Sequence, residues 1–440
     1  MNNNKAAHNT NQLNKFMSTN IVMNYGLRGL GILLGLLHTS LVLGYLGHSL
    51  YGTWATISSI ASWINFGDLG IGNGLRNQLA VAVAEEDELK QKRLIITAGY
   101  TLTKVAVVLF FLLTGVTEFM FLMNIMDPSL RLPMCITNAF FCAELVFGVA
   151  RSSAYGFQMS WLTSLAQTGT VLLRIVGIVL LTWVTSAPSL VPFSLMSGIC
   201  GILGNVIIIV IMFKKVKWKE RTPLRKCNYP EYGKTISSLG IQFFVLQIAC
   251  LILYSTDNVI INKLISSEAV SEYSLITKIY TTGENLFSII LISLWSAVTY
   301  AMAQGNYDWI KKSIRKLLVV WVLFSCGVVI VSLGLNFIMQ LWLGENAVRY
   351  DTPIIVLFAL YTITGTFGSI FVNVTNGLGR LKVQMHFAIV EAIVNIPLSI
   401  FFATTCNMGV FGVKLATWIC CVGSIVFVPI DIIRYLRTKD

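Results

Sequence analysis

Charged side chains lie inside several long apolar stretches of this sequence, where an unpaired charge is costly. At the centre of a bilayer each would cost about 2.5 to 3.5 kcal/mol, so a set facing lipid would exceed a typical protein stability of about 5 to 15 kcal/mol. Most of them must therefore pair with one another or line water, although Arg76 and Lys414 are near enough to span ends to reach the membrane surface. The full set is Arg28, Asp68, Arg76, Lys104, Glu144, Arg174, Asp257, Lys278, Glu284, Glu391 and Lys414.

Three of these cations, Arg28, Arg174 and Lys278, lie far from any expected span end. We expect them to border a wet cavity, because a charge at that depth needs either water or a partner. The alternative is that each cation forms a buried ion pair with an acidic side chain that also lies inside the apolar spans. Those acidic side chains are Asp68, Asp257 and Glu284.

Polar and small residues recur every three or four positions around these charges, which places them on one face of each helix. The first such face carries Asn20, Asn24, Arg28, Gly31, Gly35 and His38, and a later one carries Ser274, Thr277, Lys278, Thr281, Glu284, Asn285 and Ser288. A face of this kind either lines a hydrophilic cavity or packs helix against helix through Gly, Ser and Thr. Packing is favoured for the small residues alone, and a cavity for the charged ones.

The elements that carry these faces are transmembrane helices. Of the 440 residues 55% are hydrophobic and only 12% charged, against roughly 25% charged in a soluble domain. We count about twelve apolar spans long enough for the bilayer core. They lie near residues 20–46, 51–83, 94–122, 132–154, 161–185, 191–213, 234–262, 270–302, 316–340, 353–376, 384–405 and 408–433.

The basic residues predict the orientation and the division of the chain. Lys and Arg concentrate in alternate loops and at both ends, most densely in the stretch 214–234, which places both termini in the cytoplasm. We therefore predict an all-α polytopic membrane protein with two six-helix lobes around a central cavity. The N-terminal lobe spans residues 1–213, a basic cytoplasmic linker spans 214–233, and the C-terminal lobe spans 234–440. The same bias accounts for the net charge of +12 without a nucleic-acid partner.

Motifs for catalysis, metal or cofactor binding are not evident. The glycine-rich run GDLGIGNGLRN (67–77) lacks the Lys-Ser/Thr ending and the preceding strand of a phosphate loop, so close helix packing is the better reading. The nine cysteines form no CxxC pair and the four histidines have no metal-binding spacing. We predict no cofactor, no metal and no enzymatic activity. The basic linker with Trp218 is either an anionic-lipid contact or only a topology signal.

The segment Leu41 to Ala80 resembles the start of Wzx-type O-antigen and polysaccharide-repeat flippases of the multidrug/oligosaccharidyl-lipid/polysaccharide exporter superfamily. The resemblance is carried by LGHSLYGTW (46–54) and by DLGIGNGLRN (68–77). It implies translocation of an undecaprenyl-diphosphate-linked oligosaccharide from the cytoplasmic to the periplasmic leaflet of a bacterial inner membrane by alternating access. It also implies a cationic cavity for the diphosphate, membrane lipids as surroundings, and a polysaccharide polymerase and a chain-length regulator as partners.

Under this resemblance we assign Arg28, Arg174, Lys278 and Asn24 to the substrate, because guanidinium groups match a phosphate bidentately and an ammonium acts as a point charge. The acidic set Asp68, Asp257 and Glu284 is assigned to charge balance or to a coupling ion, proton or sodium. The alternatives are a multidrug cation antiporter on the same fold, a peptidoglycan-precursor flippase and, from another class, a membrane polysaccharide polymerase or acyltransferase.

Overall fold

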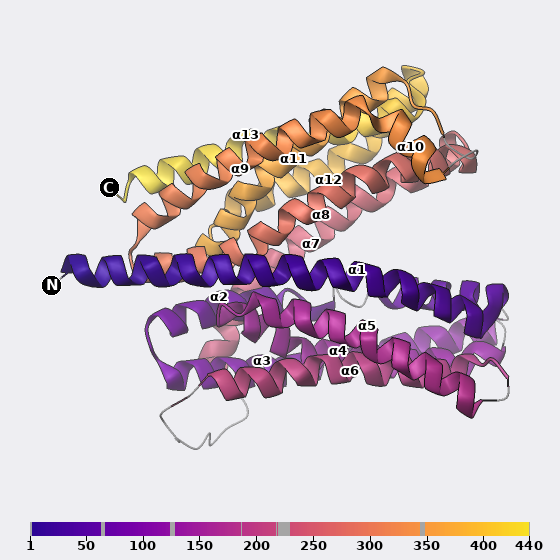
Figure 1. The fold of residues 1–440 in the computed structure, drawn as a ribbon, viewed down its shortest axis with the longest axis horizontal. Coiled ribbons are helices and arrows are strands. Elements are labelled where there is room, and N and C mark those ends of the chain that lie inside the picture. Colours follow the sequence, from indigo (N-terminus) through magenta and orange to yellow (C-terminus); the bar gives the residue numbers. More distant parts are fainter. Residues whose placement is uncertain are drawn as a thin grey trace. The chain divides into compact units, whose positions relative to one another are not determined.

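A computed structural model describes residues 2–62, 67–123, 128–185, 187–216, 218, 229–343 and 348–439. The chain forms two compact units, one of residues 11–243 and one of residues 244–440 together with residues 1–10. Every regular element in the described ranges is a helix (Figure 1). The prediction of an all-helical, polytopic, two-lobed protein is confirmed.

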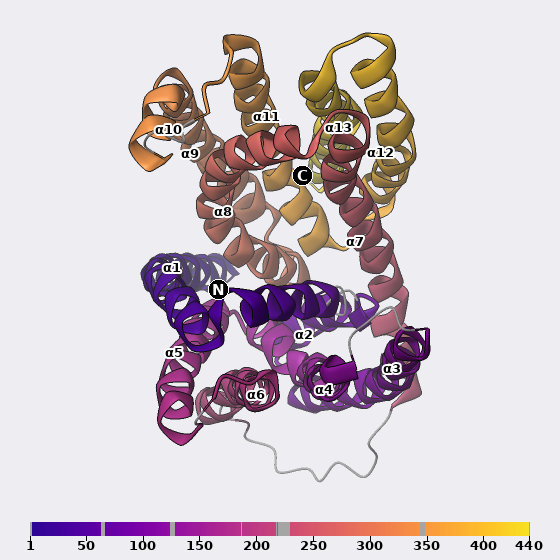
Figure 2. The same ribbon diagram turned by 90° about the vertical axis from the view of Figure 1, so that its right-hand side faces the viewer.

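The first unit is built around one central helix. Its elements are α1 (Asn2–Ser62), α2 (Ile71–Ala84), α3 (Glu88–Leu122), the short η2 (Pro128–Leu130), α4 (Arg131–Gly156), α5 (Ser160–Val184), α6 (Leu190–Lys215) and the start of α7 (Pro230–Leu264). Helix α4 packs against α2, α3, α5 and α6 (Figure 2). The Asp87 carboxylate accepts from the Lys90 N–H at 2.9 Å and so caps α3.

The second unit repeats this plan around α11 (Thr352–Leu378), which packs against α8, α9 and α13. Its other elements are α8 (Ser267–Ala303), α9 (Tyr307–Leu333), α10 (Leu335–Leu343), α12 (Lys382–Ile400), the π-helical turn η4 (Phe401–Thr405) and α13 (Gly409–Arg437). Side chains of Ser266 and Asn306 accept backbone N–H groups at the starts of α8 and α9. Gly379, at φ 66°, ends α11 in the left-handed conformation that glycine adopts without strain.

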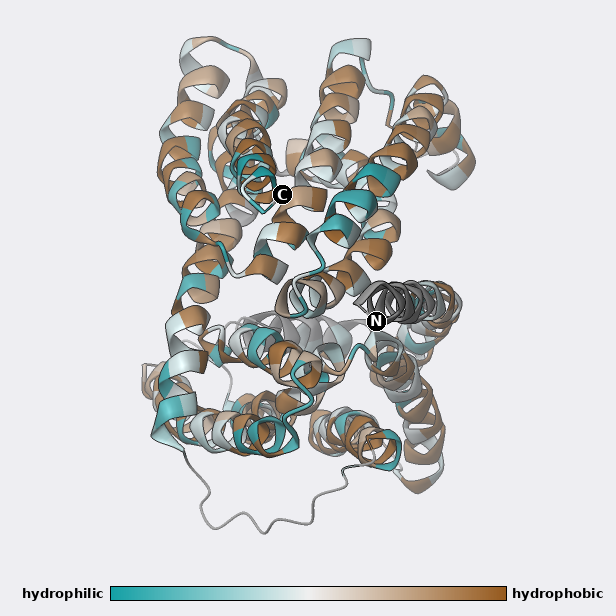
Figure 3. Ribbon diagram, turned by 90° about the vertical axis from the view of Figure 1, so that its left-hand side faces the viewer, coloured by the Kyte–Doolittle hydropathy of each residue, from teal (hydrophilic) through white to brown (hydrophobic). Residues whose placement is uncertain are grey.

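Much of the exposed surface of both units is apolar. Eleven helices of the described residues are long and apolar enough to cross a membrane. Large hydrophobic side chains on them are exposed, among them Phe111, Trp183 and Leu333, which is 85% exposed. Hydropathy colouring shows long hydrophobic stretches along the helices (Figure 3). Such surface is stable only against lipid, so the chain is a multi-pass membrane protein.

The span predicted at residues 51–83 is wrong as a single helix. Helix α1 bends at Gly47 and ends at Ser62, residues 63–66 lie outside the described ranges, and α2 begins only at Ile71. Leu69 and Gly70 both have positive φ, at 51° and 71°, and two successive left-handed residues cannot continue an α-helix. The 14 residues of α2 extend only about 21 Å, less than the bilayer core of about 30 Å.

Candidate functional site

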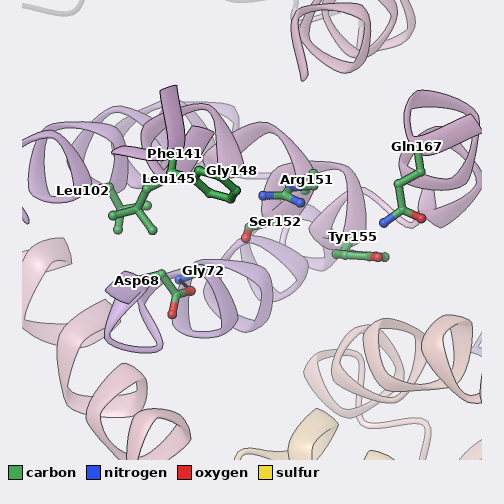
Figure 4. Close-up of a pocket in the computed structure, with 10 residues that line it drawn as sticks. All are labelled: Asp68, Gly72, Leu102, Phe141, Leu145, Gly148, Arg151, Ser152, Tyr155 and Gln167. Atoms are coloured by element: carbon green, nitrogen blue, oxygen red, sulfur yellow. Dashed lines mark hydrogen bonds between the residues drawn. The ribbon is translucent and has the colours of Figure 1, made fainter. Parts of the chain in front are cut away.

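Two small cavities lie in the first unit. One, of about 230 Å³, is lined from α2, α3, α4 and α5; the other, of about 240 Å³, is lined from α4, α5 and α6. Arg151 and Gln167 belong to the lining of both. Figure 4 shows the first cavity, with Asp68 from the segment before α2, Arg151 and Ser152 from α4, and Gln167 from α5. The cavities are therefore polar although they lie among membrane-spanning helices.

The cations of these cavities have unused hydrogen-bond donors. The Arg151 guanidinium makes no hydrogen bond or ion pair with any described residue, and it is half-buried. Arg174, in the second cavity, donates from Nη2 to the Ser197 carbonyl at 3.4 Å, while its buried Nε has no partner among the described residues. Five donors on a rigid fork suit an anion that accepts several hydrogen bonds.

The two carboxylates at the cavities of the first unit have different surroundings. Asp68 accepts the N–H groups of Gly70 at 2.9 Å and Gly72 at 3.3 Å, which makes it the anionic cap of α2. A Cβ added at Gly201 would strike the Glu144 carboxylate and lie 3.6 Å from Arg174 Nη2. Glu144 and Arg174 thus flank the same glycine, and they form no salt bridge within the described chain.

The second unit contains a larger cavity, of about 640 Å³, between α7, α8, α11 and α13. Hydroxyl and amide side chains contribute much of its wall, as the polar face around Lys278 predicted. They include Asn258, Ser274, Thr277, Thr281, Asn285, Ser288, Thr366 and Ser369. Lys278 is exposed and lines this cavity, and its ammonium group makes no hydrogen bond or ion pair with a described residue. It is therefore a free point charge at the cavity wall.

A second lysine of this cavity is held in place. Lys414 is 5% exposed, and its Nζ lies 3.3 Å from the centre of the Tyr361 ring, a cation–π contact. Asp257 accepts from the Tyr273 hydroxyl at 2.7 Å and from the Thr417 hydroxyl at 3.1 Å. Glu284 accepts from the Thr362 hydroxyl at 3.0 Å. Both carboxylates are thus hydrogen-bonded by the protein itself, while Lys278 is not.

The four residues assigned to substrate have different surroundings within their own units. Asn24 and Arg28 of α1 face α5: the Asn24 amide donates to Ser160 at 3.0 Å and accepts from Ser164 at 2.6 Å, and Arg28 Nε donates to Ser164 at 3.4 Å. Asn24 is 2% exposed, so both of its polar atoms serve the packing of two helices. Arg174 and Lys278 line cavities. None of the three predicted cations belongs to a salt bridge of the described residues.

The surroundings of three cations were predicted wrongly from the sequence. Arg151 lies near the end of a predicted span and was counted as a loop charge that sets topology. Lys414 and Arg76 were expected to reach the membrane surface, but both are 5% exposed, with the Arg76 guanidinium 4.5 Å from the centre of the Tyr155 ring. The signal for Arg151 was available: Glu144, Gly148 and Arg151 share one face of α4 at a spacing of three or four residues.

The glycine-rich run that carries the family resemblance has a packing role. Cβ atoms at Gly72 and Gly74 would collide with the Ser152 hydroxyl of α4 and with the Ile236 carbonyl of α7. Gly70 supplies the left-handed turn before α2. The run therefore allows α2 to begin against two neighbouring helices beside the cavity that holds Asp68.

Comparisons with known proteins agree with this architecture. Residues 18–300, more than half of the chain, match the family described as "Polysaccharide biosynthesis protein", and residues 243–401 match the family described as MatE. A Yersinia pseudotuberculosis protein named for O-antigen export is 20% identical over 81% of this chain and 82% of its own length. A Salmonella typhi protein named for O-antigen transport is 20% identical over 86% of this chain and 87% of its own.

Solved transporter structures share the fold. The bent form of a Vibrio cholerae MATE transporter has a TM-score of 0.79 at 12% identity and covers 98% of this chain and 99% of its own. A Pyrococcus furiosus transporter of the MOP superfamily has a TM-score of 0.76 at 13% identity, covering 98% and 96%. At these identities the likeness concerns the fold. The family match extends through the first unit and into the second, and the chain belongs to the polysaccharide biosynthesis protein family, on the fold of the MOP transporters.

Proposed function

We propose that this protein is a flippase for a lipid-linked oligosaccharide, an undecaprenyl-diphosphate-bound repeat of an O-antigen or another surface polysaccharide. The protein would carry it from the cytoplasmic to the periplasmic leaflet of a bacterial inner membrane by alternating access. Membership of the polysaccharide biosynthesis family and the names of the two bacterial relatives support this class of cargo. A polymerase and a chain-length regulator would act next on the exported repeat.

The observation that carries the proposal is the difference between cations and carboxylates at the cavities. Asp68, Asp257 and Glu284 already accept hydrogen bonds from the protein. Arg151 and Lys278 line cavities and make no hydrogen bond or ion pair with a described residue. Arg151 lies within electrostatic range of Asp68 and Glu144, so the clearest free binding capacity is that of Lys278, and it suits an anion such as a diphosphate. The hydroxyl and amide wall around Lys278 offers further partners for sugar hydroxyls.

A multidrug cation antiporter is the alternative on the same fold. Such a carrier needs free carboxylates and open aromatic faces for a cationic drug. The cavity of the second unit contains both types of residue, but the face of Tyr361 is covered by Lys414 and the carboxylates are occupied. If the protein is an antiporter, loss of the gene is expected to raise drug sensitivity and to leave surface polysaccharide unchanged.

A polymerase or acyltransferase would need an acceptor site outside the membrane. The longest connection between spans on the expected periplasmic side covers residues 334–351 and includes the short α10. Names of the relatives refer to export and transport. We therefore assign no catalytic role to this chain.

Complementation of a deletion strain tests the proposal. Arg151→Ala and Lys278→Ala are each expected to abolish surface polysaccharide while the protein still accumulates in the membrane. The matched controls are Arg349→Ala and Lys263→Ala, which remove the same charges from exposed positions away from the cavities, and they are expected to restore the wild-type coat. Normal polysaccharide in both cavity variants would contradict the assignment.

A further inference from the structure

One end of the second unit is strongly basic, and its cations line none of the three cavities described above. Eight exposed cations come from the first three turns of α9, the turn between α11 and α12, and the end of α13. They are Lys312, Arg315, Lys316, Arg380, Lys382, Arg434, Arg437 and Lys439, and we call them the basic end surface. The acidic residues described in the same segments are Asp308 and Asp431. Asp431 is already paired with Arg380 at 3.2 Å, so the surface keeps a large positive excess.

Aromatic contacts hold this surface together. The rings of Tyr307 and Tyr435 lie 6.2 Å apart and join the start of α9 to the end of α13, which lie side by side near the marked C-terminus in Figure 1. The Arg380 guanidinium lies 4.4 Å from the centre of the Tyr435 ring, and the Lys439 ammonium lies 5.6 Å from it. Tyrosine paired with cations at helix ends is typical of the headgroup level of a bilayer.

Lipid-facing apolar side chains adjoin the cations along the same helices. On α9, Val319 and Leu323 are 63% and 69% exposed, one and two turns beyond Arg315 and on the same face. On α13, exposed Ile430 and Ile433 precede Arg434 and Arg437 by four residues each. A molecule bound here would therefore meet apolar side chains with one part and cations with the other. A phospholipid has this form, whereas a soluble acidic protein would contact the cations alone.

We propose that the basic end surface binds anionic phospholipid headgroups, with the acyl chains lying along α9 and α13. Each Lys or Arg near an anionic leaflet adds about 1 kcal/mol, which is about fivefold in binding. This proposal does not depend on the transported cargo, because it concerns a surface outside the three cavities.

Binding of phosphatidylglycerol to the purified full-length protein in neutral detergent tests the proposal. The wild type is expected to bind this lipid in preference to phosphatidylcholine, in a manner weakened by salt. Arg434→Gln/Arg437→Gln is expected to weaken binding by about 5- to 25-fold. Arg434→Lys/Arg437→Lys is expected to keep it. The matched control, Lys263→Gln/Arg349→Gln, removes two exposed cations elsewhere and is expected to bind as the wild type does.

Equal binding of the two lipids by the wild type would overturn the proposal. Equal losses of phosphatidylglycerol binding in Arg434→Gln/Arg437→Gln and in the control variant would also overturn it. If an acidic protein is retained through these cations while phosphatidylglycerol is not, the surface is a protein interface and the proposal is also overturned. Comparable thermal midpoints of the variants and the wild type exclude unfolding as the cause of lost binding. Surface polysaccharide export is tested separately with the cavity variants.

Discussion

Lys278 offers a substitution that changes charge with little effect on packing, because its side chain is exposed to a cavity and bonds to no described residue. We expect Lys278→Gln to lose transport and Lys278→Arg to keep most of it, since a diphosphate needs the charge more than the shape of the group. Thermal midpoints of both variants are expected to stay at the wild-type value. Transport at the wild-type level in Lys278→Gln would remove this residue from the site.

Tyr273 has a structural role in the same cavity, because its hydroxyl donates to Asp257 at 2.7 Å from a buried position. Tyr273→Phe leaves that carboxylate one donor short, which is expected to cost about 1 to 3 kcal/mol. The measurement is the thermal midpoint in detergent. Tyr100→Phe is the control, since the Tyr100 side chain is exposed, and it is expected to leave the midpoint unchanged. An unchanged midpoint in Tyr273→Phe would mean that the hydrogen bond adds nothing to stability.

Residue types and spacing predicted some of the side chains that line the cavities and not others. The cost of charge in a membrane identified Arg174, Lys278, Asp257 and Glu284, and the structure places all four near cavities or within their walls. Arg28 and Asn24 followed the same helical pattern and instead pair α1 with α5. A polar face on one helix does not show whether it lines a cavity or packs against another helix. That depends on which residues of the neighbouring helix lie opposite it.

Single glycines set how closely the helices of a unit approach. Gly377 of α11 faces α8, and an added Cβ would lie 2.7 Å from the Trp295 carbonyl oxygen. Gly377→Ala must therefore push the two helices apart, which is expected to lower stability by about 1 to 3 kcal/mol. Gly365 on the same helix has no atom within 4 Å of its added Cβ, and Gly365→Ala is expected to leave stability unchanged or slightly raised. Equal thermal midpoints for the two variants would refute this packing.

The limits of the spans were predictable wherever apolar runs end in charge, Gly or Pro, as for α4, α5, α6 and α11. The limits of the helices after Gly47 were not predictable, because residues 51–83 form one apolar stretch by hydropathy alone. Its interruption depends on backbone conformation at Leu69 and Gly70 and on the capping carboxylate of Asp68. A Gly-Asp-Leu-Gly sequence permits that turn but does not require it.

At the scale of the whole molecule, the basic residues predict that both termini are cytoplasmic. Cys406, exposed in the turn between η4 and α13, would then face the periplasm, and residue 439 the cytoplasm. In variants whose other cysteines are replaced, a membrane-impermeant maleimide is expected to label Cys406 on intact cells. Lys439→Cys, in a chain that also lacks Cys406, is expected to react only after permeabilisation. The reverse pattern would invert the orientation.

The central claim is that free cations in the cavities hold the diphosphate of a lipid-linked oligosaccharide during transfer between leaflets. Its most direct test is reconstitution of the purified protein in vesicles with an undecaprenyl-diphosphate oligosaccharide whose sugar carries a fluorophore, followed by an impermeant quencher. The wild type, Arg349→Ala and Lys263→Ala are expected to move the label between leaflets, and Arg151→Ala and Lys278→Ala are expected to leave it in place. Movement of the label at the wild-type rate in both cavity variants, or no movement in the wild type while a cationic dye is transported, would contradict the account.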